Sequence, residues 1–162
     1  MRQRLYAHIV WTTRSRAPLI DARRARFLNR LLRVIGRQHR LLILDLGMVS
    51  THLHLLVRFH PMTRLSDSLQ RLKGASSALT ERDCRSNTLP PLRWARGYSV
   101  DTVGFGSLEQ ARSYVRDQAK RHPDEAIHGW ENPPPVTAAR ESEWWSENRR
   151  SLRVWYESND SG

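Results

Sequence analysis

Apolar and polar residues alternate most regularly along residues 51–59, which read Thr-His-Leu-His-Leu-Leu-Val-Arg-Phe. The alternation, together with the β-branched and aromatic content, predicts a β-strand. Successive side chains of a strand point to opposite faces, so His52, His54, Leu56 and Arg58 are expected to share one face. The two imidazoles would lie roughly 6.5–7 Å apart along the strand, a spacing that suits a shared metal ion. Half-buried histidines that hydrogen-bond to neighbours would give the same pattern.

The rest of the pattern predicts three further strands and three helices. The strands are expected over residues 5–12 and 41–49 and within residues 94–104, where an aromatic-basic turn leads into the strand. The helices are expected over residues 21–38, 66–82 and 107–121. Ser50 and Thr51 alone separate two of the strands, which predicts a tight antiparallel hairpin. The resulting order of elements is that of an α+β, ferredoxin-like or RRM-like fold. In such a fold we expect an antiparallel sheet with its helices packed on one face and the other face open to a ligand.

Several residues are expected to set the helix ends or to distort a helix. Asp21 is a candidate N-cap, and Ser107 with Gln110 matches a capping box, in which each side chain bonds a free backbone N–H. Pro123 ends the third helix. Residues 74–77 place a glycine and two serines inside the second helix, where they cost stability relative to alanine. That cost indicates a close neighbour at this point, either a phosphate backbone or the sheet.

The composition changes after the third helix, and we divide the chain into a catalytic domain of residues 1–122 and a C-terminal extension of residues 123–162. Three consecutive prolines at 133–135 predict a stiff spacer. Thr137 is then expected to cap a helix that runs to about residue 151. The extension is rich in large aromatic side chains, namely Trp144, Trp145, Trp155 and Tyr156. These would suit stacking on single-stranded bases, whereas a tail folded over the core or over a partner subunit would bury them.

The charge of the chain favours a polyanionic partner. The formal net charge is +11 and the pI is about 11.2. Lys73 and Lys120 are the only lysines, so arginine dominates the basic residues. Arginine binds phosphate in a bidentate manner and stacks on bases, which favours nucleic acid. Codon bias can explain the choice of arginine over lysine, but it does not explain the net charge.

Composition also bears on the cellular compartment. No segment approaches the ~20 apolar residues of a membrane span. The N-terminal residues lead straight into a predicted strand instead of a signal peptide. Cys84 is the single cysteine, which excludes an internal disulfide and a cysteine-based zinc site. We therefore expect a soluble protein without a membrane partner, cytoplasmic in bacteria and associated with the nucleoid.

The third helix is expected to bring a second set of polar residues to the histidine strand. Tyr114 and Gln118 lie four residues apart and therefore on one helix face, which His122 continues. This line is rotated by only about 60° from the apolar stripe of the helix, given ~100° per residue. It should therefore lie at the margin of the sheet, facing His52 and His54. The alternative for Tyr114 is an amphipathic residue that fills this margin without chemistry.

Five sequence blocks occur in an order that is typical of one family. They are His8–Thr13, His52–Val57, Leu72–Ser77, Trp94–Val100 with Thr102–Gly104, and Tyr114–Gln118. With these blocks the chain resembles the single-tyrosine HUH transposases of small bacterial insertion sequences, including the REP-associated tyrosine transposases. HUH stands for histidine, hydrophobic residue, histidine. The resemblance extends over roughly residues 6–122, which is most of the chain.

The resemblance implies an enzyme that cuts and rejoins single-stranded DNA at hairpin-bearing ends. It implies that Tyr114 is the nucleophile, which forms a 5′-phosphotyrosine and frees a 3′-OH. It also implies that His52, His54 and Gln118 hold Mg²⁺ or Mn²⁺. Such an ion would polarise the scissile phosphate, and storage of the bond on the tyrosine would allow rejoining without ATP. Family members act as homodimers in which the tyrosine of one subunit serves the histidines of the other, so a homodimer is expected here.

Further residues are candidates for DNA contact and for support of the site. Contacts with the DNA backbone and hairpin are assigned to Arg14, Arg16, Lys73 and Arg96. His8 and His122 are accessory candidates at the site. The chain departs from the family pattern at Ser50-Thr51, where Pro-Asp is common, so it lacks an aspartate that would help to orient the histidines. Asp101 stands where a small hydroxyl residue is usual.

Two other classes of function would use the same residues differently. A non-catalytic nucleic-acid binder, such as an RNA-recognition module or a retired transposase, would stack bases on sheet aromatics such as Trp11 and Tyr98. The chain contains no block with the RNP1 pattern of such modules. A metal-dependent phosphoesterase would use the histidine pair to activate water and would form no adduct on Tyr114. Sensitivity to the loss of the Tyr114 hydroxyl separates both classes from a transesterase.

Overall fold

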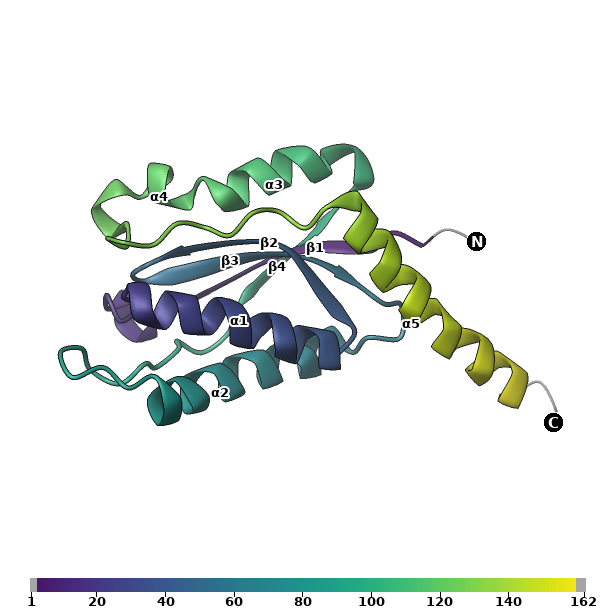
Figure 1. Cartoon of the computed structure of the whole chain (residues 1–162), viewed down its shortest axis with the longest axis horizontal. Coiled ribbons are helices and arrows are strands. Elements are labelled where there is room, and N and C mark those ends of the chain that lie inside the picture. The colour runs from purple at the N-terminus through teal and green to yellow at the C-terminus, as the bar shows by residue number, and fades with distance from the viewer. Residues whose placement is uncertain (1–2, 160–162) are drawn as a thin grey trace.

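The computed structural model describes residues 3–159, and the side chains of residues 3–149. Within this range four strands form one antiparallel sheet in the order β2-β3-β1-β4, so the histidine strand β3 is internal (Figure 1). The strands are β1 (Tyr6–Thr12), β2 (Leu41–Val49), β3 (His52–Phe59) and β4 (Ser99–Val103). The helices are α1 (Ala22–Gln38), α2 (Leu65–Asp83), α3 (Leu108–Arg116), α4 (Gln118–Arg121) and α5 (Ala138–Asn159). No helix in this described range is long and apolar enough to cross a membrane.

The predicted α+β class with an antiparallel sheet is confirmed, but the helices do not all lie on one face. α1 and α2 cover one face, whereas α3 and α4 lie over the other (Figure 1). The reason is that the sheet presents apolar side chains on both sides. Leu53 and Leu55 of β3 belong to the core under α1 and α2, while Leu56 packs with Leu108 and Val115 of α3. The face predicted to be open to a ligand is therefore largely covered by α3.

The alternation along β3 is as predicted, but β2 changes its register. A β-bulge between Ile43 and Asp45 inserts one extra residue into the pairing of β2 with β3. A shift of one residue exchanges the two faces of a strand. After the bulge Asp45 and Gly47 face α3, where the Asp45 carboxylate accepts hydrogen bonds from Arg112 at 2.9 Å and Arg116 at 3.2 Å. The bulge thus lets a buried ion pair hold α3 against the sheet.

Residues 94–104 form a turn followed by a strand, as predicted. Only Ser99–Val103 pairs within the sheet, and Trp94 forms an isolated bridge with Thr13. Gly97 lies between these two segments with a φ of 77°, a left-handed conformation that glycine adopts without steric penalty. The turn at Gly97 therefore prevents a continuous strand.

Two of the three predicted caps form. Asp21 caps α1 and accepts a hydrogen bond from the Arg24 N–H at 2.8 Å. Thr137 caps α5 and accepts one from the Arg140 N–H at 3.3 Å. The capping box at Ser107 is wrong, because the side chain of Ser107 makes no capping hydrogen bond. Its backbone (φ −102°, ψ 5°) is near-helical and not extended, so the hydroxyl is not aimed at the helix end.

Residues 74–77 are predicted to have a close neighbour. In the structure this neighbour contacts Ser76 and does not contact Gly74. Ser76 is buried and its Oγ accepts a hydrogen bond from the Trp94 indole N–H at 2.9 Å. A Cβ at Gly74 would meet nothing within 4 Å. The neighbour is therefore the loop before β4, and the sheet does not press on Gly74.

The segment from Pro123 to α5 runs along the outer edge of β2 (Figure 1). The Val136 N–H donates to the Leu44 carbonyl at 2.9 Å, and the Ser50 N–H donates to the Glu125 carbonyl at 2.8 Å. Asn132 adds a side-chain contact, since its Oδ1 accepts from the N–H of Met48 at 3.3 Å. The segment is thus hydrogen-bonded to β2 at several points.

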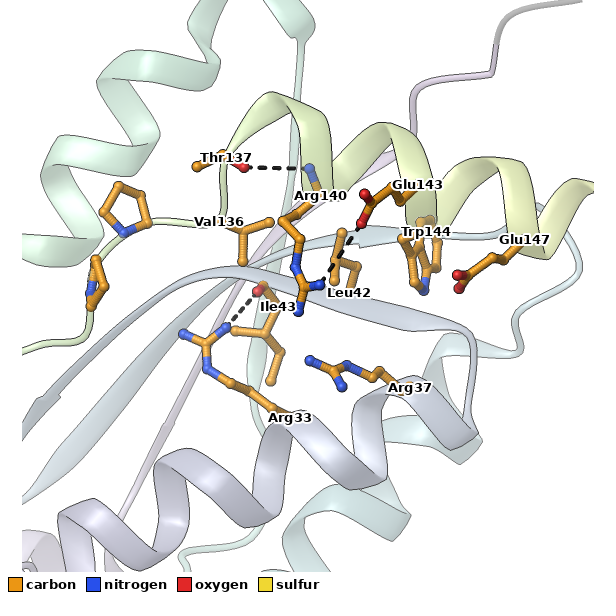
Figure 2. A pocket seen from close by; sticks show the side chains of 12 residues that line it. Arg33, Arg37, Leu42, Ile43, Val136, Thr137, Arg140, Glu143, Trp144 and Glu147 are labelled. Carbon is orange, nitrogen blue, oxygen red and sulfur yellow. Dashed lines mark hydrogen bonds and ion pairs between the residues drawn. The ribbon is translucent and has the colours of Figure 1, made fainter.

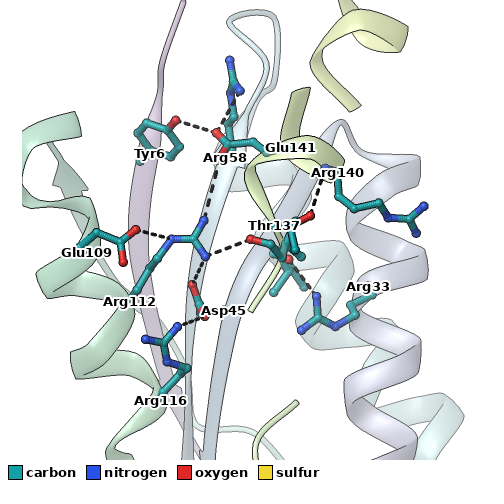
Figure 3. A network of polar contacts seen from close by, with 12 residues as sticks. Tyr6, Arg33, Asp45, Arg58, Glu109, Arg112, Arg116, Thr137, Arg140 and Glu141 are labelled. Atoms are coloured by element: carbon teal, nitrogen blue, oxygen red, sulfur yellow. Dashed lines mark hydrogen bonds and ion pairs between the residues drawn. The ribbon is translucent and has the colours of Figure 1, made fainter. Parts of the chain in front are cut away.

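The start of α5 is fixed to the sheet by a buried polar network (Figure 3). The Glu141 carboxylate accepts hydrogen bonds from the Tyr6 hydroxyl at 2.6 Å and from Arg58 at 2.9 Å. Trp144 is buried in the apolar cluster on the α3 side of the sheet. For Trp144 the tail therefore folds over the core. The side chains of Trp155 and Tyr156 lie outside the described residues, although α5 runs past the predicted end at residue 151.

Candidate active site

Four of the described histidines form a continuous series on the α3 side of the sheet. His52 and His54 of β3 are 3% and 5% exposed. His8 of β1 stacks on His54, with His8 Nε2 and His54 Nδ1 2.8 Å apart. Ring centroids are 5.2 Å apart for His52 and His54 and 4.9 Å apart for His52 and His122. The structure therefore brings both accessory candidates next to the predicted pair.

Gly47 sets how closely α3 approaches these histidines. It pairs with His54 across the β2–β3 hairpin. A Cβ at Gly47 would lie 1.9 Å from the Val115 carbonyl oxygen and 3.0 Å from Cγ of Gln118. No side chain fits into this space, so Gly47 is the residue that lets α3 and α4 lie close to the sheet.

The helix predicted over residues 107–121 is interrupted at Asp117, which separates α3 from α4. The Gln118 side chain replaces the backbone hydrogen bond that is lost at this interruption. Its Nε2 donates to the Tyr114 carbonyl at 2.8 Å, a role that the backbone N–H four residues on takes in a continuous helix. The Gln118 Oε1 is buried and makes no hydrogen bond of regular geometry among the described residues, but the Gln118 side chain interacts with the His52 imidazole and opposes the lowering of its pKa by burial.

Tyr114 lies over the histidine series and remains open to solvent. Its ring centroid is 5.6 Å from that of His8 and 5.8 Å from that of His54, in edge-on contacts. Its exposure is 38%. The guanidinium carbon of Arg121 lies 4.3 Å from the ring centroid, close enough for a cation–π interaction. Tyr114 and the histidine pair of the same chain thus form one cluster.

Burial keeps His8, His52 and His54 neutral. Desolvation, followed by the neighbouring imidazoles, lowers the pKa of His54 to about 3. Desolvation also lowers the pKa of His52 and of His8, although the carboxylates of Glu125 and Asp101 respectively oppose the shift. A neutral imidazole has the free lone pair that a metal ion requires. These side chains are therefore in the metal-binding protonation state at neutral pH.

The donor set at the centre of the cluster fits a hard divalent ion. His52 Nδ1 lies 2.9 Å from Thr51 Oγ1 and His54 Nδ1 contacts His8, so the Nε2 atom of each ring is the one left for a metal. The buried Oε1 of Gln118, whose side chain interacts with His52, adds an oxygen donor. Within residues 3–149 no three His, Cys, Asp or Glu side chains are grouped to hold one ion. Two imidazoles and an amide oxygen, without a thiolate, could hold a divalent ion and would leave positions for water and phosphate.

Glu125 is a site residue that sequence reasoning missed. It lies in a short 3-10 turn (Pro123–Glu125) after α4. Its Oε2 is 3.5 Å from His52 Nδ1 and 3.8 Å from His122 Nδ1. It follows a helix-ending proline in a segment without periodicity, so no sequence signal marks it. Arg121 was also missed, although it lies seven residues after Tyr114, two turns along the same face.

The loop after β1 carries two of the residues predicted to contact DNA. Arg14 and Arg16 lie in a 3-10 turn and are exposed. Ser15 and Arg16 adopt left-handed φ values of 56° and 52°, which are uncommon for residues other than glycine. One guanidinium nitrogen of Arg16 lies 3.6 Å from a carboxylate oxygen of Glu125. The loop is thus adjacent to the histidine series, and its contact with DNA stays a prediction.

The other two predicted contacts are Arg96, which lies in the turn before β4, and Lys73 of α2, which contacts that turn. Arg96 is exposed. The Lys73 ammonium donates hydrogen bonds to the carbonyls of Ala95, at 2.7 Å, and of Gly97. In the structure Lys73 therefore holds this turn, and its contact with DNA stays a prediction.

A separate cavity of about 510 Å³ opens between α1, β2 and α5 (Figure 2). Arg33, Arg37 and Arg140 line it. Arg33 donates to the Ile43 carbonyl at 2.8 Å, and Arg140 pairs with Glu143 at 3.8 Å. None of its lining residues belongs to the histidine series, so the cavity is distinct from the candidate active site.

A buried His-Leu-His strand lies under a helix that carries a solvent-open tyrosine, the arrangement expected from the resemblance to single-tyrosine transposases. The family model described as "Transposase IS200 like" matches residues 1–118. The chain belongs to the IS200-like transposase family. The transposase for insertion sequence element IS200 of Salmonella typhimurium (strain LT2) is 27% identical over 114 residues, which cover 68% of this chain and 74% of that protein. The corresponding protein of Salmonella typhi matches to the same extent.

Solved structures agree with this assignment. A proposed transposase of Deinococcus radiodurans R1 superposes with a TM-score of 0.57 at 26% identity, covering 73% of this chain and 93% of that one. A REP-associated tyrosine transposase bound to a REP hairpin superposes with a TM-score of 0.58, covering 75% of this chain and 72% of that one. The identity to the second protein is 11%, so this likeness shows the fold alone.

Proposed function

We propose that the chain is a metal-dependent single-stranded DNA transesterase that nicks and rejoins hairpin-bearing ends through Tyr114. The observation that supports it is the cluster of a solvent-open tyrosine, two buried histidines and the buried amide oxygen of Gln118 beside His52. Membership of the IS200-like transposase family supports a DNA-processing enzyme. The REP hairpin bound to the distant REP-associated relative supports a DNA hairpin as the class of partner.

In the proposed cleavage step the Tyr114 hydroxyl oxygen attacks the scissile phosphorus. A bond forms between these two atoms, and the bond from phosphorus to the 3′ oxygen breaks. Tyr114 gives its proton to solvent and the 3′ oxygen takes one up, so the products are a 5′-phosphotyrosine and a 3′-OH. In rejoining, a 3′-OH attacks the phosphotyrosine and Tyr114 regains its proton. Each step exchanges one phosphate ester for another, so no ATP is needed.

The surrounding residues have distinct roles in this proposal. His52, His54 and Gln118 would hold Mg²⁺ or Mn²⁺, which supplies stabilisation of the charge that develops on the phosphate. Burial keeps both imidazoles unprotonated and therefore able to bind. α3 holds Tyr114 over the pair, and Arg121 places a positive charge beside the attacking side chain. Arg14, Arg16, Lys73 and Arg96 are the proposed DNA contacts.

A homodimer is part of the proposal, but the geometry favours a site built within one subunit. Tyr114 and His54 of the same chain have ring centroids 5.8 Å apart. One chain therefore contains the proposed nucleophile and the proposed metal ligands together. We propose that each subunit acts on DNA with its own tyrosine in this conformation.

A covalent-adduct assay tests the proposed function. Purified protein is incubated with Mn²⁺ and a pool of end-labelled single-stranded hairpin oligonucleotides, and the products are separated on a denaturing gel. We expect a labelled protein band that is lost with EDTA and in Tyr114→Phe. Tyr98→Phe is the matched control, because Tyr98 is exposed to a similar degree, 40%, in the turn before β4. It should keep the band.

Each alternative outcome identifies a different function. DNA cleavage without an adduct, unchanged in Tyr114→Phe, would support a phosphoesterase that activates water at the histidines. Tight binding without cleavage or adduct would support a non-catalytic nucleic-acid binder. An adduct that survives in Tyr114→Phe would contradict the assignment of the nucleophile. Light scattering with size-exclusion chromatography gives the number of subunits separately.

A further inference from the structure

We infer that Glu125 is a positioning residue of the metal site, whose carboxylate fixes His52 with Nδ1 protonated and Nε2 directed at the ion. The inference rests on the proposed function, since it requires His52 to bind a metal. Glu125 lies outside residues 1–118, the part of the chain that matches the family. The Ser50-Thr51 turn before His52 contains no carboxylate of its own. The C-terminal segment would thus supply a group that this turn lacks.

The backbone of Glu125 is attached directly to the turn that precedes His52. The Ser50 N–H donates to the Glu125 carbonyl at 2.8 Å, and the Ser50 carbonyl accepts from the Ile20 N–H at 3.0 Å. The Glu125 N–H donates to the His122 carbonyl at 3.0 Å, which ties the turn to the end of α4. Glu125 and His52 are therefore held in a fixed position relative to each other, although they are 73 positions apart in the sequence.

The carboxylate faces His52 with an unsatisfied oxygen. Glu125 Oε2 is buried and has no hydrogen-bond partner among the described residues. The nearest imidazole nitrogens are Nδ1 of His52, at 3.5 Å, and Nδ1 of His122, at 3.8 Å. A buried acceptor without a donor is destabilising, and an N–H on His52 Nδ1 would relieve it after a small approach. That tautomer leaves the lone pair on Nε2, as in metal sites where a carboxylate backs a histidine ligand.

Thr51 also contacts His52 Nδ1, but this contact alone does not determine which ring nitrogen of His52 carries the proton. Its Oγ1 lies 2.9 Å from His52 Nδ1. A hydroxyl can donate or accept, so it is compatible with either tautomer, whereas a carboxylate only accepts. The other oxygen of Glu125 lies 3.6 Å from Arg16, which helps to orient the carboxylate. Of the two groups beside Nδ1, Glu125 is therefore the one that favours the Nδ1–H form.

Two measurements on the full-length, DNA-free protein test this role. Calorimetric titration with Mn²⁺ compares the wild type, Glu125→Gln and the matched control Asp124→Asn, an exposed neighbour with the same change of charge. We expect about 10–100-fold weaker binding for Glu125→Gln, as for other groups that orient metal ligands. Asp124→Asn should bind as the wild type does. Two-bond ¹⁵N–¹H spectra without metal should show His52 as the Nδ1–H tautomer in the wild type and a mixture in Glu125→Gln.

The outcomes separate this inference from the proposed function. Unchanged Mn²⁺ affinity and tautomer in Glu125→Gln would overturn the role of Glu125 while leaving the transesterase intact. Equal weakening in Asp124→Asn would also overturn it, because net charge alone would then explain the effect. A wild type that binds no Mn²⁺ contradicts it as well. Glu125-dependent Mn²⁺ binding in a protein that forms no Tyr114 adduct would support the role and contradict only the proposed reaction. Equal melting temperatures confirm that each variant is folded.

Discussion

Gly47 of β2 lies directly under the Val115 carbonyl oxygen, so closely that a Cβ there would be 1.9 Å from that oxygen. Tyr114 immediately precedes Val115, and Gln118 follows within one turn. The height of α3 above the sheet therefore decides how far both proposed site residues stand from the histidines. A residue without any side-chain chemistry controls the geometry of the site.

Gly47→Ala should destabilise the protein and disturb the site. The added methyl group must push α3 away or strain β2, and overpacking of this kind costs about 1–3 kcal/mol. Urea unfolding followed by tryptophan fluorescence measures the change in the free energy of unfolding. Mn²⁺ affinity should also fall, because Gln118 is hydrogen-bonded to the Tyr114 carbonyl of α3 and would move with that helix.

Gly74→Ala is the control and should act in the opposite direction. Gly74 lies within α2, and a Cβ there meets nothing within 4 Å. Alanine at an exposed position in a helix is favoured over glycine by about 0.5–1 kcal/mol. Destabilisation of similar size in both variants would mean that the close contact at Gly47 is not what makes that position special.

Glu141→Ala should loosen the attachment of α5. The side chain of Glu141 is 11% exposed and that of Arg58 is 8% exposed, so the pair is largely desolvated. Removal of the carboxylate leaves Arg58 buried without its partner, and losses of about 3–5 kcal/mol are typical of such changes. The pKa of Tyr6, which burial and then Glu141 raise to about 12, should fall. Urea unfolding and ultraviolet titration of the tyrosines measure the two effects.

Glu143→Ala provides the comparison on the same helix. Glu143 pairs with Arg140 at 3.8 Å, and both side chains are more than half exposed. Exposed pairs contribute about 0–1 kcal/mol. A loss as large as that of Glu141→Ala would show that removal of any acidic residue from α5 destabilises the fold.

The free energy of unfolding should decrease as the pH is lowered from about 6.5. Burial lowers the pKa of His54 to about 3, whereas the unfolded chain binds the proton near 6.5. Between these values the unfolded state holds a proton that the folded state does not, so stability is lost as the pH falls. One such group contributes up to about 1.4 kcal/mol per pH unit.

Substitution of His54 isolates this contribution. His54→Asn should flatten the dependence of unfolding free energy on pH between about 6.5 and 5. His128→Asn, at an exposed histidine after the Glu125 turn, should leave the slope as it is. A slope that is the same in all three proteins would contradict a neutral, buried His54.

Mixing of inactive variants tests assembly of the site within one subunit. Tyr114→Phe and His54→Ala are purified separately, mixed, and assayed for the covalent adduct. The contact of Tyr114 with its own chain's His54 predicts no adduct in the mixture, because neither variant has a complete site. Recovery of the adduct would instead show exchange of the tyrosine between subunits.

The sequence predicts those parts of the fold that depend on local pattern. The alternation of β3 correctly places His52 and His54 on one face. Helical spacing also brings Tyr114 and Gln118 over that face, although the two residues belong to separate helices, α3 and α4. The distribution of helices over the sheet was not predictable in the same way. It depends on which of two apolar faces each helix covers, and Leu56 and Val115 reveal their pairing only in three dimensions.

The parts of the site that the sequence pattern does not predict depend on polar side chains and on contacts between residues far apart in the sequence. The bulge at Asp45 changes the faces of β2 without a sequence signal, yet it is what directs Gly47 toward α3. At the interruption at Asp117 the Tyr114 carbonyl accepts its hydrogen bond from the Gln118 side chain and not from a backbone N–H. Glu125 reaches His52 from a segment that has neither alternation nor helical spacing.

The prolines beside β2 have a consequence for how copies of the protein can associate. β2 is an edge strand, and its free carbonyl and N–H groups would otherwise be a template for a strand from another molecule. Pro134 and Pro135 line the same cavity as Leu42 and Ile43 of β2, and proline has no N–H with which to extend a sheet. The covering segment thus closes this border of the sheet without continuing it. Any continuous sheet between two copies would have to join them through β4, whose residues are largely exposed.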